Sequence, residues 1–137
     1  MGPAYTQVLR FESKSVSSSH RISLKSQWKL EQRFHLDRTD QAEFLAVRAF
    51  HRPTGISNSQ VVCICFEPLG ANLEVFFNGF KITWNLIEGL ATVPITGMMH
   101  SLNRVELRWR GDPQETPQLP EHFKAWLEIS NGNQHEP

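Results

Sequence analysis

This chain lacks an excess of charge of either sign, long apolar runs and the features of a secretory signal. Its 137 residues carry 14 basic and 14 acidic side chains, so the formal net charge is zero. A neutral chain has no long-range field that would draw it to nucleic-acid phosphates. No apolar stretch approaches the roughly 18–20 residues that cross a bilayer. We therefore expect no nucleic-acid partner and no membrane partner.

Cysteine is also scarce, since only Cys63 and Cys65 are present. They lie two residues apart in a predicted strand and so point to the same side, where they are poorly placed to form a disulfide with each other. We expect free, buried structural thiols. The first residues lack the basic and apolar regions of a signal peptide. Together these features favour a reducing compartment and a cytoplasmic location.

Motifs for catalysis, metal binding and cofactor binding are likewise missing. The six histidines show no His-x-His or His-Glu-x-x-His spacing, and the cysteines form no Cys-x-x-Cys pair. The chain has no Gly-x-Ser-x-Gly elbow and no Gly-rich phosphate loop. A carboxylate pair of the glycosidase type would require the fold to bring two distant glutamates together. We expect no catalytic residue, no metal and no cofactor, and hence a protein that is not an enzyme.

What the sequence does contain is a strong hairpin signal at Asn78-Gly79. Two residues of this type between β-rich runs favour a type I′ turn, because that turn needs a positive φ at both central residues. The turn sets a register in which one apolar face carries three pairs: Phe77 with Phe80, Val75 with Ile82, and Leu73 with Trp84.

Alternating apolar and polar residues predict further strands. They span residues 5–11, 28–36, 61–66, 104–110 and 123–129. The strand at 28–36 alternates weakly and suits a sheet edge, whereas 61–66 is apolar on both faces and suits a central, doubly covered position. Residues 85–97 are expected to be irregular because Glu88-Gly89 and Pro94 interrupt them.

Two segments allow either a helix or a strand. Residues 43–50 follow a possible capping box at Asp40 and Glu43, yet Leu45, Val47 and Ala49 alternate as in a strand. The segment from Pro120 to residue 129 could place an apolar stripe on a helix. A strand is favoured in both cases.

About eight short strands with little helix indicate an all-β sandwich or barrel. Residues 66–79, Phe-Glu-Pro-Leu-Gly-Ala-Asn-Leu-Glu-Val-Phe-Phe-Asn-Gly, and residues 101–109, Ser-Leu-Asn-Arg-Val-Glu-Leu-Arg-Trp, resemble the galactose-binding-like jelly roll. That superfamily is typified by the sugar-binding domain of β-galactosidases and β-glucuronidases. Its members carry a Val-Trp-Val-Asn-Gly type hairpin and, further on, a Gly-Glu-Asn turn. Asn103 matches the turn Asn, while Ser101 and Leu102 replace Gly-Glu.

The resemblance covers about residues 50–110. It implies an antiparallel two-sheet β-sandwich of the jelly-roll type that acts as a non-catalytic module. The length fits one sandwich domain over residues 1–130, and residues 131–137 are expected to form a disordered tail.

Aromatic side chains on the solvent faces of the strands offer a route to a ligand, because sugars dock their apolar faces on exposed rings. By parity, Phe76 and Trp126 lie opposite the core residues of their strands. The predicted ligand or partner surface consists of Phe76, Lys81, Glu106, Arg108 and Trp126. We expect a non-catalytic module for a carbohydrate-type ligand. The alternative is a protein–protein or self-association module, which the absence of net charge favours because little repulsion opposes contact.

Overall fold

The computed structural model describes residues 19–35 and 38–131, and all regular elements within these ranges are β-strands. The predicted strand at 5–11 and residues 132–137 of the predicted tail lie outside the described residues, and Asn131 is the last residue of a strand. No helix in the described ranges is long and apolar enough to cross a membrane.

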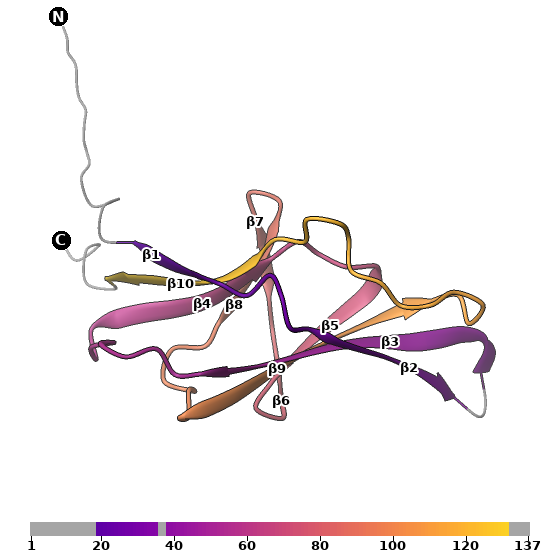
Figure 1. Cartoon of the computed structure of the whole chain (residues 1–137), viewed down its shortest axis with the longest axis horizontal. Coiled ribbons are helices and arrows are strands. Elements are labelled where there is room, and N and C mark those ends of the chain that lie inside the picture. The colour runs from indigo at the N-terminus through magenta and orange to yellow at the C-terminus, as the bar shows by residue number, and fades with distance from the viewer. Residues whose placement is uncertain (1–18, 36–37, 132–137) are drawn as a thin grey trace, which may run out of the picture.

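The strands form two antiparallel sheets of five strands each. The first sheet has the order β1 (His20–Ser23), β10 (Ala125–Asn131), β4 (Gln60–Phe66), β8 (Leu90–Pro94) and β7 (Asn85–Ile87). The second has the order β2 (Lys29–His35), β3 (Arg38–His51), β9 (Leu102–Gly111), β5 (Ala71–Phe77) and β6 (Phe80–Ile82). The sheets lie as two layers (Figure 1), so the predicted antiparallel β-sandwich is confirmed.

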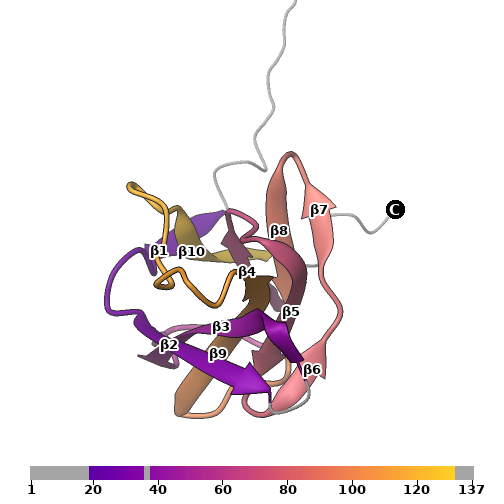
Figure 2. The same ribbon diagram turned by 90° about the vertical axis from the view of Figure 1, so that its right-hand side faces the viewer.

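The core fills the space between the two layers. Alternate side chains point inward from each sheet, as the period of two requires. Ile64 and Phe66 from the first sheet and Val75, Phe77 and Leu107 from the second are fully buried. Figure 2 shows β1 and β2 on one side of the sandwich and β7 and β6 on the other.

The loop between β9 and β10 closes the side of the sandwich that carries β1 and β2. Phe123 is buried there and meets Trp28 edge-on, with 5.8 Å between the ring centroids. At its other end, the Gln32 side-chain amide donates to the carbonyl of Pro113 at 3.1 Å. This loop therefore fixes the edge strand β2 against the rest of the molecule.

The hairpin at Asn78-Gly79 has the predicted turn and the predicted register. Both residues have positive φ, 50° and 88°, and the ladder pairs Phe77 with Phe80 and Val75 with Ile82. The ladder ends at Ile82, so the predicted third pair is not part of it. Phe80, the first residue of the edge strand β6, is 68% exposed, whereas Ile82 of the same strand packs against the core.

Residues 85–97 are not irregular, so that prediction was wrong. Strands β7 and β8 pair across Glu88-Gly89, whose φ values of 52° and 81° make the same kind of turn as Asn78-Gly79. Glutamate is an unusual first residue for such a turn. The dipeptide that we interpreted as a break is the tip of a second hairpin.

The first ambiguous segment is a strand, as favoured, and of the second only residues 125–129 are a strand, because 120–124 form a turn and loop. β3 runs through residues 43–50, and β10 begins at Ala125 after the buried Phe123. β2 lies at a sheet edge and β4 at the centre of its sheet, also as predicted.

The cysteines of β4 differ from the prediction in one respect. The pairing places Cys65 beside Trp126 and Cys63 beside Glu128 on the outer face of the first sheet, not in the core. Both thiols are free; Cys65 is buried and Cys63 is half-buried. Burial raises the pKa of Cys65 to about 11, and the neighbouring Cys63 and Glu128 add to the rise.

Candidate functional site

Four of the five predicted surface residues lie together on the outer face of the second sheet. Strand register sets out this face in two cross-strand rows. The first row is Lys29, Val47, Glu106, Phe76 and Lys81, and the second row is Glu31, Leu45, Arg108 and Glu74. We call these nine residues the charged face.

Glu106 lies at the centre of the charged face and is buried, with 5% of its surface exposed. Its carboxylate accepts a hydrogen bond from Arg108 Nε at 2.5 Å and forms an ion pair with Arg104, whose Nη1 lies 3.2 Å from Oε1. The prediction that Glu106 is a solvent-facing ligand contact was wrong, because the carboxylate is shielded and held by two arginines. Its role is to position these arginines, and removing it would leave two cations without their shared partner.

Phe76 is half-buried and is not a free platform. The guanidinium of Arg108 lies over its ring, 4.0 Å from the centroid. Such cation–π contacts contribute about 0.5–1 kcal/mol at exposed sites and more when desolvated. The ring therefore packs against a side chain of its own sheet on the outer face where parity placed it.

Lys81 is also engaged, since its Nζ lies 2.7 Å from Glu74 Oε2. The hydrogen bond from Lys81 lowers the pKa of the Glu74 carboxyl, although the Lys81 side chain is largely in solvent. Phe76, Arg108 and Glu106 thus form one connected set, and Lys81 forms a separate ion pair with Glu74 on the same face. This arrangement makes the charged face ordered and locally neutral.

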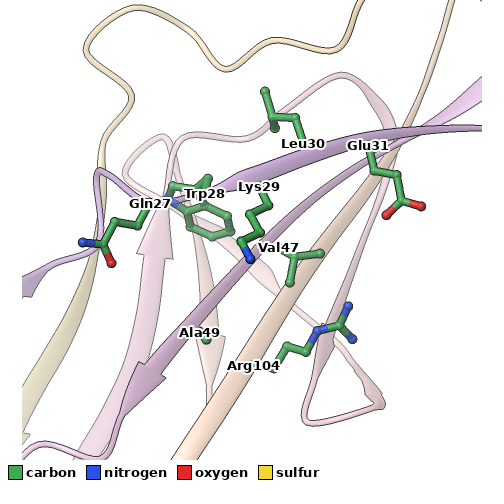
Figure 3. A pocket seen from close by; sticks show the side chains of 8 residues that line it. All are labelled: Gln27, Trp28, Lys29, Leu30, Glu31, Val47, Ala49 and Arg104. Atoms are coloured by element: carbon green, nitrogen blue, oxygen red, sulfur yellow. The ribbon is translucent and has the colours of Figure 1, made fainter.

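Next to this set lies a depression of about 800 Å³, which spans β2, β3 and the start of β9 (Figure 3). Its floor is formed by Val47 and Ala49, while Lys29, Glu31 and Arg104 supply charged walls. In Figure 3, Lys29 and Glu31 extend to the same side as Val47, whereas Leu30 extends to the opposite side of β2. The remaining lining residues are Gln27, Trp28 and Leu30.

Chemically, the depression offers an apolar floor flanked by donors and acceptors. Lys29 and Arg104 can only donate, Glu31 can only accept when ionised, and the Gln27 amide can do both. The half-buried Trp28 adds aromatic surface, and its indole N–H is already used by the carbonyl of Leu24 at 2.5 Å. Gln27 has a φ of 68°, which is uncommon for a residue with a side chain.

The residues of the depression are not recognisable from the sequence alone. Lys29, Glu31, Val47 and Ala49 come together only because β2 pairs with β3 in a register that places 29 beside 47. The alternation of both segments was visible, but the register shifts between Phe34 and His35, so the 35–38 pairing does not predict which residue lies beside Lys29.

Trp126 lies apart from the other four predicted residues. It belongs to β10 in the first sheet, where its cross-strand neighbours are Ser23 and Cys65. Its ring carries the guanidinium of Arg21 at 4.5 Å. The predicted five-residue surface is therefore two surfaces on opposite sides of the sandwich.

Within the described residues, no three His, Cys, Asp or Glu side chains come close enough together to hold a metal ion. Six ion pairs are found there, and two of them share Glu106. All six lie on strands or turns. None of these pairs resembles a nucleophile beside a base.

The fold and the geometry of this face define a class, namely an all-β, two-sheet antiparallel sandwich with an outer sheet face hollowed by a depression. No protein-family profile matches the chain, and no curated protein matches its sequence. Among solved structures, an FMN-binding β-glucuronidase from Facaelibacterium prausnitzii L2-6 is similar, with a TM-score of 0.57 and 16% sequence identity. The similarity covers 82% of this chain and 22% of that protein. The chain therefore shares its sandwich fold with part of a glycosidase and spans about a fifth of its length.

Proposed function

We propose that this chain is a non-catalytic binding module that holds a carbohydrate-type ligand in the depression beside the charged face. One observation carries the proposal: an apolar floor of Val47 and Ala49 between the charged walls Lys29, Glu31 and Arg104. A sugar ring has an apolar C–H surface and a rim of hydroxyls, so it matches a floor and walls of this kind. The depression is also within the size range of small-molecule sites, about 300–1,000 Å³.

The sandwich relationship supports the same proposal. The similar part of the β-glucuronidase is a sandwich within a sugar-processing enzyme, and the hairpin at Asn78-Gly79 and the turn at Asn103 fit the galactose-binding-like jelly roll. We propose membership of that superfamily on these features. A β-glucuronide is therefore a reasonable first ligand to test alongside a general glycan array.

A bulky residue on the floor tests the site directly. Ala49 is exposed at the floor of the depression, so the indole in Ala49→Trp occupies the space of the ligand without disturbing the core. This variant should abolish glycan binding without lowering the melting temperature. Ala71→Trp is the matched control, because Ala71 is an exposed alanine of the same sheet outside the depression. If both variants bind glycans like the unmodified chain, the ligand does not occupy this depression and the proposal fails.

A protein–protein module is the second candidate, favoured by apolar side chains exposed at the sheet edges on one side of the sandwich. Phe80 on β6 is 68% exposed, and Leu86 and Ile87 on β7 are 63% and 52% exposed. Ile87→Lys should lower the mass measured by light scattering if these edges associate. Leu102→Lys is the control, since Leu102 is similarly exposed but lies on the central strand β9. A monomeric unmodified chain would exclude self-association through these edges.

The proposal that the module is non-catalytic is tested with a panel of chromogenic glycosides and esters at neutral pH. We expect no turnover above that of buffer. Turnover that is lost in Glu31→Gln would instead place an acidic catalyst in the depression and replace the binding function by an enzymatic one.

A further inference from the structure

The first sheet carries a second hollow, of about 430 Å³, on the side of the sandwich where β1 meets the loop that precedes β10. Four of its lining residues are cationic or can become so: Arg21, Lys25, His122 and Lys124. The fifth notable residue is Trp126, whose indole supplies apolar surface in the wall. We call these five residues the basic hollow.

The charge balance of the basic hollow differs from that of the charged face. None of its lining residues is acidic, although the chain as a whole is neutral. Three carboxylates border the hollow without lining it. Glu128 accepts from Arg21 Nε at 3.0 Å, from Trp126 Nε1 at 2.8 Å and from the Ser19 hydroxyl. Glu121 lies 3.7 Å from His122 Nε2, and Glu67 accepts from the backbone N–H of Lys124. These carboxylates lie outside the lining, so the side chains that face the hollow are cationic or neutral.

Two side chains of the basic hollow, Arg21 and Trp126, are held in place. Arg21 is fixed twice, by its ion pair with Glu128 and by its stacking over Trp126 at 4.5 Å. Because the Trp126 indole N–H is also used by Glu128, ring and guanidinium form one ordered unit. A preorganised site loses less conformational entropy when a ligand binds.

The backbone of the loop that precedes β10, which also lines the basic hollow, is anchored too. The backbone N–H of Lys124 donates to Glu67 Oε1 at 2.9 Å, and its carbonyl accepts from the backbone N–H of Glu67 at 3.0 Å. His122, two residues earlier, has a φ of 64°, a conformation that costs free energy in a residue with a side chain. This backbone therefore places Lys124 and His122 at the rim of the hollow.

We propose that the basic hollow is a second binding site, which takes a sugar-sized ring carrying a carboxylate or phosphate. The anion would lie between Lys25 and Lys124, and the ring would contact Trp126. The site is separate from the depression of the proposed function, because it lies on the other sheet and shares no lining residue with it.

The test compares three sugars that share a ring: methyl β-D-glucuronide, glucose 6-phosphate and the uncharged methyl β-D-glucoside. Binding is followed by the indole N–H resonance of Trp126 in a ¹⁵N-labelled full chain, assigned with Trp126→Phe. We expect the charged sugars to shift this resonance with Kd values at or below about 1 mM at low salt and the glucoside to bind at least about tenfold more weakly. Added salt should weaken the binding of both charged sugars.

Two sets of variants locate the binding. The double variant Lys25→Gln and Lys124→Gln should weaken the charged sugars by about tenfold or more, while Lys29→Gln, in the other depression, should leave their effect on Trp126 unchanged. The relative affinities of the glucuronide and the phosphate distinguish the two sources of the anion. The proposal is overturned if neither charged sugar shifts Trp126, if the glucoside binds as well, or if the double variant behaves like the unmodified chain. Ala49→Trp separates the two sites, because it should block glycans in the first depression only.

Discussion

Gly70 shows how closely single residues are constrained in this sandwich. It has a φ of 47°, and a Cβ at this position would overlap the indole ring of Trp109. Trp109 is itself buried and meets Phe44 edge-on, with 5.9 Å between the ring centroids, so it has little room to move. The space beside Gly70 is therefore filled by Trp109, one member of an aromatic pair in the core.

We predict that Gly70→Ala lowers the free energy of unfolding by about 2–5 kcal/mol, the sum of a positive-φ penalty and overpacking. Gly55→Ala is the matched control, because Gly55 has a φ of 82° but nothing within 4 Å of its Cβ position. It should lose only the backbone term, about 1–2 kcal/mol. Chemical denaturation of both variants measures the difference, and equal losses would mean that Trp109 moves aside freely.

The thiol of Cys65 should be almost inert at neutral pH. Burial raises its pKa to about 11, so only a minute fraction is thiolate near pH 8. We predict slow labelling of the folded Cys63→Ser variant by a thiol reagent at pH 8 and rapid labelling in denaturant. Labelling at the same rate in both states would contradict the burial of this side chain.

At the scale of elements, Asn103 joins two turns that are distant in sequence. Its amide oxygen accepts from the His100 backbone at 2.8 Å and from the Asn78 side chain at 3.1 Å, and its amide nitrogen donates to the carbonyls of His100 and Phe50. The side chain is fully buried, with 1% exposed, so these bonds have no water to replace them. Asn103 therefore holds the hairpin tip against the start of β9.

Asn103→Ala should cost about 2–4 kcal/mol, because it removes four hydrogen bonds and leaves buried polar groups without partners. Asn85→Ala, at an exposed position of the edge strand β7, should change stability by less than about 0.5 kcal/mol. Thermal unfolding of the two variants provides the comparison. A small effect at Asn103 would show that the turn at 98–103 forms without it.

The two hairpins show what local sequence could and could not predict. Asn78-Gly79 was identified with its register because both residues favour positive φ, whereas Glu88-Gly89 was missed because Glu does not. The strands on either side of the second turn, β7 and β8, are also short, and β8 ends at Pro94. Their alternation of apolar and polar residues is therefore weak. Strand assignment followed periodicity, which is a local signal.

Sheet membership was the step that the sequence could not supply. Parity correctly put Phe76 and Trp126 on outer faces, but nothing local places β10 beside β4 and β5 beside β9. The predicted site was therefore a mixture of two surfaces. The burial of Glu106 was missed for the same reason, because it depends on Val47 and Phe76 as cross-strand neighbours on both sides.

At the scale of the whole molecule, titrating groups on the two outer faces limit stability from both ends of the pH scale. Glu74 has a pKa below its ordinary value because Lys81 donates to it. Burial tends to raise the pKa of Glu128, but hydrogen bonds from Ser19 and Trp126 and the charge of Arg21 outweigh it, so this pKa is also lowered. Both carboxylates therefore stabilise the fold above about pH 4.5, the ordinary value, and this contribution is lost as the pH falls.

The thiols act in the opposite direction. Burial raises the pKa values of Cys63 and Cys65, so the unfolded chain loses these protons at lower pH than the folded one, and stability falls as the pH rises from 9 towards about 11. We predict that the free energy of unfolding is nearly constant between about pH 4.5 and pH 9 and falls on either side. Chemical denaturation from pH 3 to 11 measures this profile. Glu128→Gln should flatten the acid limb and Cys65→Ala the alkaline limb, whereas Glu121→Gln, at a side chain that is 90% exposed, should change neither. If the acid limb is unchanged in Glu128→Gln, the bonds from Glu128 to Arg21 and Trp126 do not persist in solution. The ordered wall of the basic hollow depends on these bonds and would then no longer be supported.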